Sequence, residues 1–187
     1  MPKVAIILAE GFEEVEAVAP IDVLRRAGVE VLIAGLSKEP VPSARNVRIV
    51  PDLSVDELNP EELDMVILPG GSKGVENLKK DPRVEKLIKA MEEKGKYISA
   101  ICAAPTALAS FGVLEGKRAT VYPALKENIK PAILVEEKVV EDKNVITSQG
   151  PGTALLFGLK LAEKLVGKEK AREVAKAMLV DWEVDNR

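Results

Sequence analysis

The 187-residue chain contains no histidine. A Cys-His nucleophile pair of the protease or amidotransferase type needs an imidazole to take the thiol proton. Neither a Cys-His protease nor a glutamine amidotransferase of that type can therefore be built within this chain, and proteolysis is disfavoured.

Cysteine and long apolar runs are also scarce. Cys102 is the only cysteine, which excludes an intramolecular disulfide. The first residues, Met1-Pro2-Lys3-Val4, run into a strand-like segment without the length of a secretory signal, and no apolar run approaches the roughly 18 residues of a membrane span. We expect a cytoplasmic protein that is not inserted in a membrane.

Aromatic residues make up only 3% of the chain, and 27 basic residues nearly balance 30 acidic ones. Such a chain offers neither a stacking platform for bases nor a strong positive field, so we expect no nucleic-acid partner. The length suits one hydrophobic core, and we predict a single domain over residues 1–187. No pattern indicates a metal or a cofactor.

The chain alternates short apolar runs with helix-forming stretches. The apolar runs at 4–8, 29–34, 65–68 and 97–101 have the pattern of strands covered on both faces. Helices are predicted between them at 14–26, ended by Gly28, and at 82–93, capped by Asp81 and ended by Gly95. This alternation predicts an α/β fold: a doubly wound, mostly parallel sheet sandwiched between helices, of the flavodoxin-like type.

Other segments depart from this rhythm. Residues 44–50 are expected to form an extended excursion or a hairpin arm. Three short apolar runs later in the chain read as extended segments with a turn at 142–144, and two final helices are separated by Gly167. These runs lie at 133–135, 139–140 and 145–147, and the final helices at 152–166 and 168–178.

Cys102 lies where the apolar run 97–101 gives way to a helix-forming stretch. The small residues Ala100 and Ala104 stand two positions before and after it, as in a nucleophile elbow. A helix N-terminus favours thiolate over thiol, so we expect Cys102 to react near neutral pH. The alternative is that a lone cysteine is a small buried hydrophobe.

Three carboxylates follow the first predicted strand. Glu13 and Glu14 are placed to compensate the dipole at the start of the next helix. Glu16 lies in the helix body, four residues before Pro20, whose ring should bend the helix there. Such a carboxylate could form a pocket wall, although a solvated Glu16 is an equal alternative.

Two further turns follow predicted core strands. Leu68-Pro69-Gly70-Gly71-Ser72-Lys73-Gly74 has exposed backbone N–H groups that could form an oxyanion hole or a phosphate nest, but it lacks the spacing of a Walker loop or of Gly-x-Gly-x-x-Gly. Ser148-Gln149-Gly150-Pro151-Gly152-Thr153 enters the next helix, and ordinary turn chemistry explains it adequately.

Taken in order, these segments resemble the ThiJ/PfpI superfamily, and most closely its branch of the Parkinson-associated deglycase. The resemblance spans nearly the whole chain and is more specific than any one motif. The segments that carry it are Ala9-Glu10-Gly11-Phe12-Glu13-Glu14-Val15-Glu16, residues 20–28, residues 45–52, Leu68-Pro69-Gly70-Gly71, residues 100–108 and residues 148–153.

The resemblance implies roles for individual residues. Cys102 matches the reactive, oxidation-prone cysteine, and Glu16 matches the acid that touches its sulfur. The N–H groups of Gly71, which follows Gly70, and of Ala103 fall where the family forms its oxyanion hole. Relatives are usually homodimers. Positions at or near their dimer contact are matched by Val15, Arg26 and Arg45.

The chain departs from the family pattern at two positions. Tyr122 stands where relatives carry a histidine near the cysteine. We therefore expect its hydroxyl to bind the substrate and not to act as a base. Ala104 replaces a common glycine, a mild change. The protease-like branch has histidine directly after its cysteine, where this chain has Ala103.

The resemblance implies a cysteine-dependent, glutathione-independent glyoxalase or deglycase that acts on methylglyoxal, glyoxal or early glycation adducts. Cys102 would form a hemithioacetal and Glu16 would act as acid and base. Two alternatives stay open. One is a redox-sensing or chaperone-type stress protein that uses Cys102 oxidation with little catalysis, and the other is a superfamily member with a different small-molecule substrate.

Overall fold

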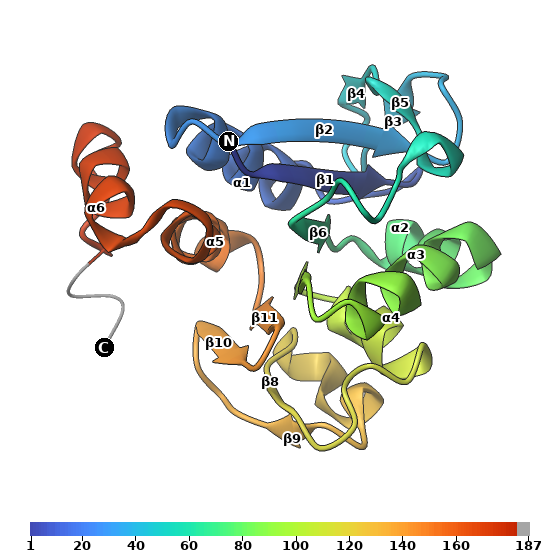
Figure 1. The fold of residues 1–187 in the computed structure, drawn as a ribbon. Helices are drawn as coiled ribbons and strands as arrows, with labels where there is room; N and C mark the ends of the chain where they lie inside the picture. The colour runs from blue at the N-terminus through green and yellow to red at the C-terminus, as the bar shows by residue number, and fades with distance from the viewer. Residues whose placement is uncertain (183–187) are drawn as a thin grey trace.

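The computed structural model describes residues 1–182 and shows a seven-stranded sheet in the order β10-β11-β7-β6-β1-β2-β5 (Figure 1). Every neighbouring pair is parallel except β10 and β11. The strands are β1 (Lys3–Leu8), β2 (Glu30–Gly35), β5 (Leu53–Ser54), β6 (Met65–Leu68), β7 (Tyr97–Ile101), β10 (Val139–Asp142) and β11 (Val145–Ser148).

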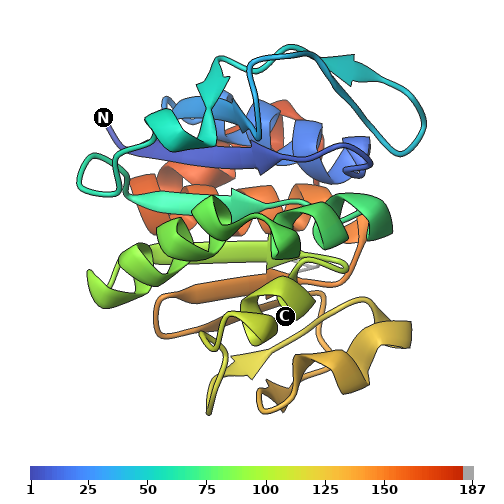
Figure 2. The ribbon, with the colours of Figure 1, turned by 90° about the vertical axis from the view of Figure 1, so that its right-hand side faces the viewer.

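Helices cover both faces of the sheet (Figures 1 and 2). One layer contains α1, α5 and α6, and the other contains α2, α3 and α4. The helices are α1 (Glu14–Arg26), α2 (Ser72–Lys80), α3 (Pro82–Glu93), α4 (Pro105–Ser110), α5 (Ala154–Val166) and α6 (Lys168–Ala177). The predicted doubly wound, mostly parallel α/β fold in a single domain is confirmed. The last five residues of the predicted 1–187 domain lie outside the described residues.

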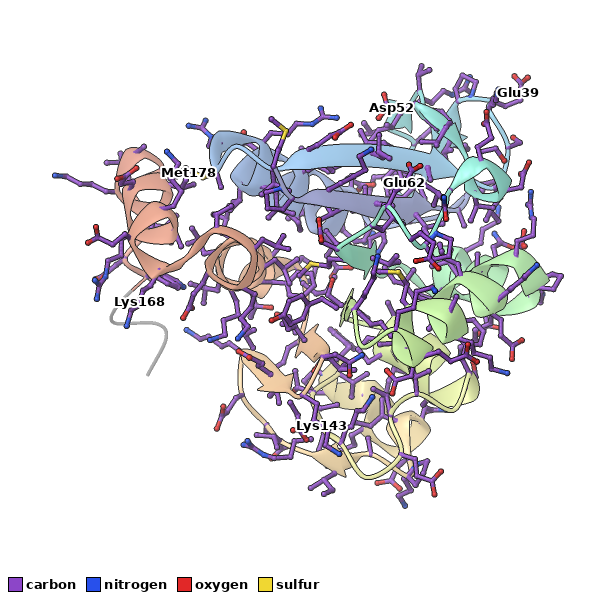
Figure 3. The ribbon with its side chains drawn as sticks, viewed as in Figure 1. Glu39, Asp52, Glu62, Lys143, Lys168 and Met178 are labelled. Carbon is purple, nitrogen blue, oxygen red and sulfur yellow. The ribbon has the colours of Figure 1, made fainter. Side chains whose placement is uncertain are left out.

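Burial on both faces explains the continuous apolar runs of the core strands. In β1, Val4, Ile6 and Leu8 belong to the core on the α1 side, whereas Ala5 and Ile7 belong to the core on the α3 side. Successive side chains of a strand point to opposite faces, so a strand covered twice needs apolar residues at every position. Charged side chains such as those of Glu39 and Lys168 lie at the periphery (Figure 3).

The predicted helix signals act as expected. The Asp81 carboxylate accepts the N–H of Arg83 at 2.9 Å and caps α3, and the Glu13 carboxylate accepts the N–H of Glu16 at 3.0 Å and caps α1. Pro20 lies inside α1, which continues past it to Arg26. None of the helices within residues 1–182 is long and apolar enough to cross a membrane.

The structure corrects the sequence interpretation at α2 and at the start of α5. Residues 72–80 form α2, which was not predicted because its first residues belong to the glycine-rich stretch at 68–74. The helix also buries few apolar side chains, chiefly Val75 and Leu78, so its apolar pattern is weak. The final pair of helices starts at Ala154, not at residue 152, since Pro151–Thr153 form the 3-10 turn η3. A second and a third 3-10 turn are η1 (Val55–Glu57) and η2 (Pro123–Ile129).

The excursion at 44–50 is a hairpin. Strands β3 (Val41–Pro42) and β4 (Arg48–Ile49) pair antiparallel, and the turn between them places Asn46 at φ 62°. Two backbone hydrogen bonds hold the hairpin against the loop after β1. The N–H of Gly11 donates to the Pro42 carbonyl at 2.9 Å, and the N–H of Ala44 donates to the Phe12 carbonyl at 2.7 Å.

The apolar runs beyond residue 130 are extended as expected. Strands β10 and β11 form the predicted hairpin, with Lys143 at φ 53° in its turn. The first run contributes β9 (Ile133–Leu134), which pairs in parallel with β8 (Arg118–Ala119) in a separate small sheet that was not predicted.

Candidate active site

Cys102 follows β7 directly and lies in a strained backbone conformation. Its φ is 65°, a region that residues other than glycine rarely adopt and that is often found at functional sites. The conformation is fixed on both sides, because Cys102 N–H donates to the Ser148 carbonyl and the Cys102 carbonyl accepts the N–H of Tyr122, each at 2.9 Å. The corner therefore presents the half-buried thiol at the carboxyl end of the sheet.

The position of α4 differs from the sequence expectation. This helix begins at Pro105, three residues after Cys102, and has only six residues. The thiol is therefore not at the first turn of a helix, and the helix dipole is not the main influence on its acidity.

Glu16 reaches the same corner from α1. Its side chain is fully buried, so the alternative of a solvated Glu16 is wrong. The carboxylate oxygen Oε1 accepts the N–H of Gly70 at 3.1 Å, which ties α1 to the turn after β6. A Cβ at Gly70 would collide with Oε1 of Glu16 and lie 2.7 Å from Cβ of Cys102, so the acid and the cysteine approach each other across this glycine.

Burial dominates the electrostatics of Glu16. Desolvation raises the pKa of Glu16, hydrogen bonds with Cys102 and with the N–H of Gly70 oppose the rise, and the nearby charge of Glu13 adds to it; the resulting pKa is about 7. The second oxygen, Oε2, is buried and has no well-aligned hydrogen-bond partner. A carboxyl group in this situation holds a proton near neutral pH and can exchange it with a neighbour.

The Cys102 thiol does not ionise easily by itself. Burial, followed by the charge of Glu16 and the hydrogen bond to it, raises the pKa of Cys102 to about 12. The expectation that position at a helix start would make this thiol acidic is therefore wrong. The effect of Glu16 acts only while Glu16 is ionised, so the two groups titrate as a pair that holds one proton over a wide pH range.

Two backbone N–H groups favour a negative charge on the sulfur. Those of Ala103 and Gly71 form hydrogen bonds to the Cys102 side chain and lower its pKa. The residues predicted to form an oxyanion hole thus converge on the sulfur. Donors in this position can stabilise a thiolate or an oxyanion that develops beside it.

Tyr122 contacts the corner through its backbone. Its N–H holds the carbonyl of Cys102, whereas its side chain is 45% exposed and its ring lies beside Gly150. The three residues predicted at a dimer contact lie outside this corner. Val15 is exposed on α1, Arg26 pairs with Asp22, and Arg45 lies in the β3–β4 turn.

Sequence reasoning missed the role of Ser148. The turn 148–153 was attributed to ordinary turn chemistry, but the Ser148 carbonyl fixes the Cys102 backbone, and its hydroxyl lies 2.7 Å from the Thr153 hydroxyl. The feature that could have pointed to Ser148 is the order of the strands in the sheet. Strand β11 lies parallel to β7 and next to it, so the residues at the carboxyl ends of the two strands lie side by side at one edge of the sheet.

These features define a class of protein: a doubly wound α/β domain whose single cysteine sits at a strained corner against a buried acid. The model of the DJ-1/PfpI family matches residues 2–164, and the chain belongs to this family. It is 47% identical over 180 residues to Protein dj-1beta of Drosophila melanogaster, an alignment that covers 95% of this chain and 96% of that protein.

Other comparisons agree. The chain is 39% identical over 180 residues to the Glutathione-independent glyoxalase DJR-1.2 of Caenorhabditis elegans, covering 94% of this chain and 96% of that protein. The crystal structure of Drosophila melanogaster DJ-1beta superposes with a TM-score of 0.93 at 46% identity, covering 96% of this chain and 98% of that one.

Replacing Gly70 by alanine should disrupt the site and weaken the fold. The new methyl group would collide with Oε1 of Glu16 and with Cβ of Cys102, at a cost of about 1–3 kcal/mol in the free energy of unfolding. Denaturant unfolding measures this loss. Gly152→Ala is the matched control, because nothing lies within 4 Å of a Cβ there. Equal free energies of unfolding for the two variants would contradict the close approach of Glu16 and Cys102 to Gly70.

Glu16→Gln should stabilise the protein in neutral and alkaline solution. The folded-state pKa of Glu16 is raised from 4.5 to about 7, so its contribution to stability is present below pH 4.5 and is lost as the pH rises toward 7. The amide avoids this loss, and we expect a gain of about 2–3 kcal/mol at about pH 8 and little gain at about pH 4. Urea unfolding at both pH values tests this, with the more exposed Glu14→Gln as control. A gain that does not depend on pH would contradict the raised pKa.

Proposed function

We propose that this protein is a glutathione-independent glyoxalase that converts methylglyoxal to lactate and glyoxal to glycolate. The observation that carries the proposal is the approach of a buried, proton-holding acid, Glu16, to the only cysteine of the chain. The name of the Caenorhabditis elegans relative supports it.

The first step is addition of Cys102 to the aldehyde. As the sulfur bonds to the aldehyde carbon, the thiol proton passes to Glu16, and the C=O bond opens to an oxyanion. The N–H groups of Gly71 and Ala103 stabilise that oxyanion, which takes the proton back from Glu16 to complete the hemithioacetal and leaves Glu16 ionised.

The second step moves a proton between adjacent carbons. Ionised Glu16 removes the proton from the sulfur-bearing carbon, which gives an enediol, and returns a proton to the neighbouring carbon. The product is a thioester of the 2-hydroxy acid, and water hydrolyses it to release lactate and the free thiol. The raised pKa of Glu16 suits both halves of this transfer and makes a histidine unnecessary.

The same addition could act on early glycation adducts. Attack of Cys102 on the carbonyl-derived carbon of such an adduct would break its bond to the protein amine or thiol, which leaves with a proton from Glu16. The same hemithioacetal remains, and the proton shift and hydrolysis described above convert it to the hydroxy acid, so lyase and hydrolase activities would share one site. Tyr122 lies beside the corner through the hydrogen bond of its N–H to the Cys102 carbonyl, and its hydroxyl could orient a substrate.

A turnover assay tests the proposal. Purified protein is incubated without any thiol cofactor with methylglyoxal, glyoxal or a glycated amino acid, and each product is measured. We expect lactate and glycolate to form in step with the loss of substrate. Failure to form either acid would refute the glyoxalase assignment, and product from the glycated amino acid alone would support the hydrolase reaction instead.

A redox-sensing role is the second candidate. The buried Oε2 of Glu16 has no well-aligned partner, and in the protonated form it could donate a hydrogen bond to oxygen added to the Cys102 sulfur. Mass spectrometry after mild peroxide treatment separates the two functions. Oxidation confined to Cys102 in a protein without glyoxalase turnover would favour the sensor.

We also propose a homodimer, in the cytoplasm, that uses the face carrying Val15, Arg26 and Arg45. Val15 and Val18 are about half exposed on α1, and the N–H of Arg45 donates to the Glu14 carboxylate, which places the hairpin turn beside this end of the helix. Sedimentation should show a particle of two chains, and Val18→Glu should shift it toward one chain. A particle of one chain in the unmodified protein would contradict the proposal.

A further inference from the structure

The N–H of Ala103, one of the two that face the Cys102 sulfur, is held in its direction by a bond at the other end of its peptide unit. That unit also contains the Cys102 carbonyl, which accepts the N–H of Tyr122 at 2.9 Å. A trans peptide is planar, so its C=O and N–H point in opposite directions, and a bond that fixes one also fixes the other. The bond from Tyr122 therefore directs the N–H of Ala103 toward the sulfur and, because it polarises the peptide, strengthens that N–H as a donor.

The second donor is held in the same way by another part of the chain. The N–H of Gly71 shares a peptide unit with the carbonyl of Gly70, which accepts the N–H of Glu13 at 2.9 Å. Glu13 is fixed by its place at the start of α1, whereas Tyr122 belongs to the segment 120–122, which lies between β8 and η2 and outside any helix or strand. The direction of the Ala103 donor therefore depends on what holds this segment.

Thr147 holds the segment 120–122 at its first residue. The Thr147 hydroxyl accepts the N–H of Thr120 at 2.9 Å, and the two residues are 0% and 1% exposed. Thr147 is itself fixed, because it lies in β11 between Ala100 of β7 and Val140 of β10. An N–H at this depth has no water to replace the hydroxyl, so losing the bond would be costly.

The segment is thus tied to the sheet at one end and to the reactive corner at the other. Only Val121, which packs in the core on the α3 side, separates Thr120 from Tyr122. A displacement of Thr120 is therefore passed to the Tyr122 N–H across a single residue.

We infer that Thr147 is a positioning residue for the oxyanion hole, because its hydroxyl fixes the segment whose Tyr122 N–H orients the peptide between Cys102 and Ala103. The inference rests on the proposed function and adds to it a residue that acts through the backbone of another segment. One of the two donors is thus set by a side chain of β11, and the other by the start of α1.

Thr147→Val tests the inference, because it removes the hydroxyl and keeps the shape of the side chain. Complete loss of an oxyanion donor costs about 10²–10³-fold in turnover, and we expect a misdirected one to cost about tenfold. The rate of Cys102 alkylation by iodoacetamide at about pH 8 should fall by about threefold or more, since the bond from Ala103 favours the thiolate. Thr147→Ser, which restores the hydroxyl, should recover both rates.

Ser99→Ala is the matched control. Ser99 lies in the neighbouring strand β7, is equally buried, and donates its hydroxyl to the Val66 carbonyl at 3.0 Å. Both variants lose a buried hydrogen bond and should unfold at lower urea concentration, but only Thr147→Val should lower the alkylation rate. Equal alkylation rates in the two variants would overturn the inference, because Thr147 would then only stabilise the fold. Slower alkylation of Thr147→Val, in a protein whose unmodified form has no glyoxalase turnover, would support the positioning role and count against the proposed function alone.

Hydrogen exchange in the unmodified protein covers a variant that fails to fold. The amides of Thr120 and Tyr122 should exchange slowly, although the Tyr122 side chain is exposed, because both N–H groups are hydrogen-bonded. In Thr147→Val the exchange of the Tyr122 amide should rise by about tenfold or more. Fast exchange at Tyr122 in the unmodified protein would overturn the inference.

Discussion

Cys102→Ala is expected to lower methylglyoxal turnover by on the order of 10⁴-fold, to the level of the uncatalysed reaction in the assay. Without the sulfur no hemithioacetal forms, and neither Glu16 nor the N–H groups of Gly71 and Ala103 can replace the covalent step. The fold should persist, because alanine keeps the Cβ of Cys102 and removes only the sulfur. Lactate formation measures the effect.

Ser110→Ala is a suitable control for this variant. It removes one small polar atom from α4, where the Ser110 hydroxyl donates to the Ala107 carbonyl at 2.7 Å away from the Cys102 corner. We expect nearly full turnover. If Cys102→Ala kept more than about a tenth of the activity, covalent catalysis by this residue would be refuted.

Glu16→Gln is expected to lower turnover by about 10²–10⁴-fold, the usual contribution of a general acid or base. The amide can donate a hydrogen bond to the sulfur but cannot take a proton from carbon. Because the charge of Glu16 is one cause of the raised pKa of Cys102, the same variant should react with iodoacetamide at least as fast as the unmodified protein.

These opposite effects separate proton transfer from activation of the thiol. If turnover and alkylation both fell together, Glu16 would serve only to ionise Cys102. Glu14→Gln, two residues earlier on the same helix and more exposed, should change neither rate. In the unmodified protein, turnover should rise with pH through about 7, as the pair loses one of its two protons, and Glu16→Gln should remove that rise.

The sequence predicted the core of the fold because the physical signals there are local and strong. Strand β1 reads as an unbroken apolar run, since residues such as Ile6 and Ile7 are buried on opposite faces of the sheet. Asp81 caps α3 where the pattern indicated it, because a carboxylate before a proline at the first helical position is a specific start signal. Helix α2 was missed because its first residues lie within a glycine-rich stretch.

The candidate site was predictable in its members but not in its electrostatics. The order of β7 and β6 in the sheet brings Cys102 beside Gly70 and Gly71, and the resemblance placed Glu16 with them. Sequence alone could not show that Glu16 is fully buried or that it helps to raise the pKa of the Cys102 thiol. Both properties depend on the packing of α1 against the turn after β6, which joins residues 54 positions apart.

Retention of a buried carboxyl with an unpartnered oxygen is costly for stability. The expected gain in stability of Glu16→Gln and its expected loss of turnover have the same origin, the desolvation of this group. Such an exchange of stability for activity is common at functional sites. The pair Glu16 and Cys102 is therefore better understood as a device for handling one proton than as an ion pair that stabilises the fold.

The protonation state of Glu16 near neutral pH is the most direct test of this account. The ¹³C resonance of its side-chain carboxyl can be followed by nuclear magnetic resonance as the pH is varied in the unmodified protein. We predict a titration with a midpoint of about 7. A midpoint at the ordinary value of 4.5 would contradict the account, because Glu16 would then hold no proton to exchange with Cys102 at neutral pH.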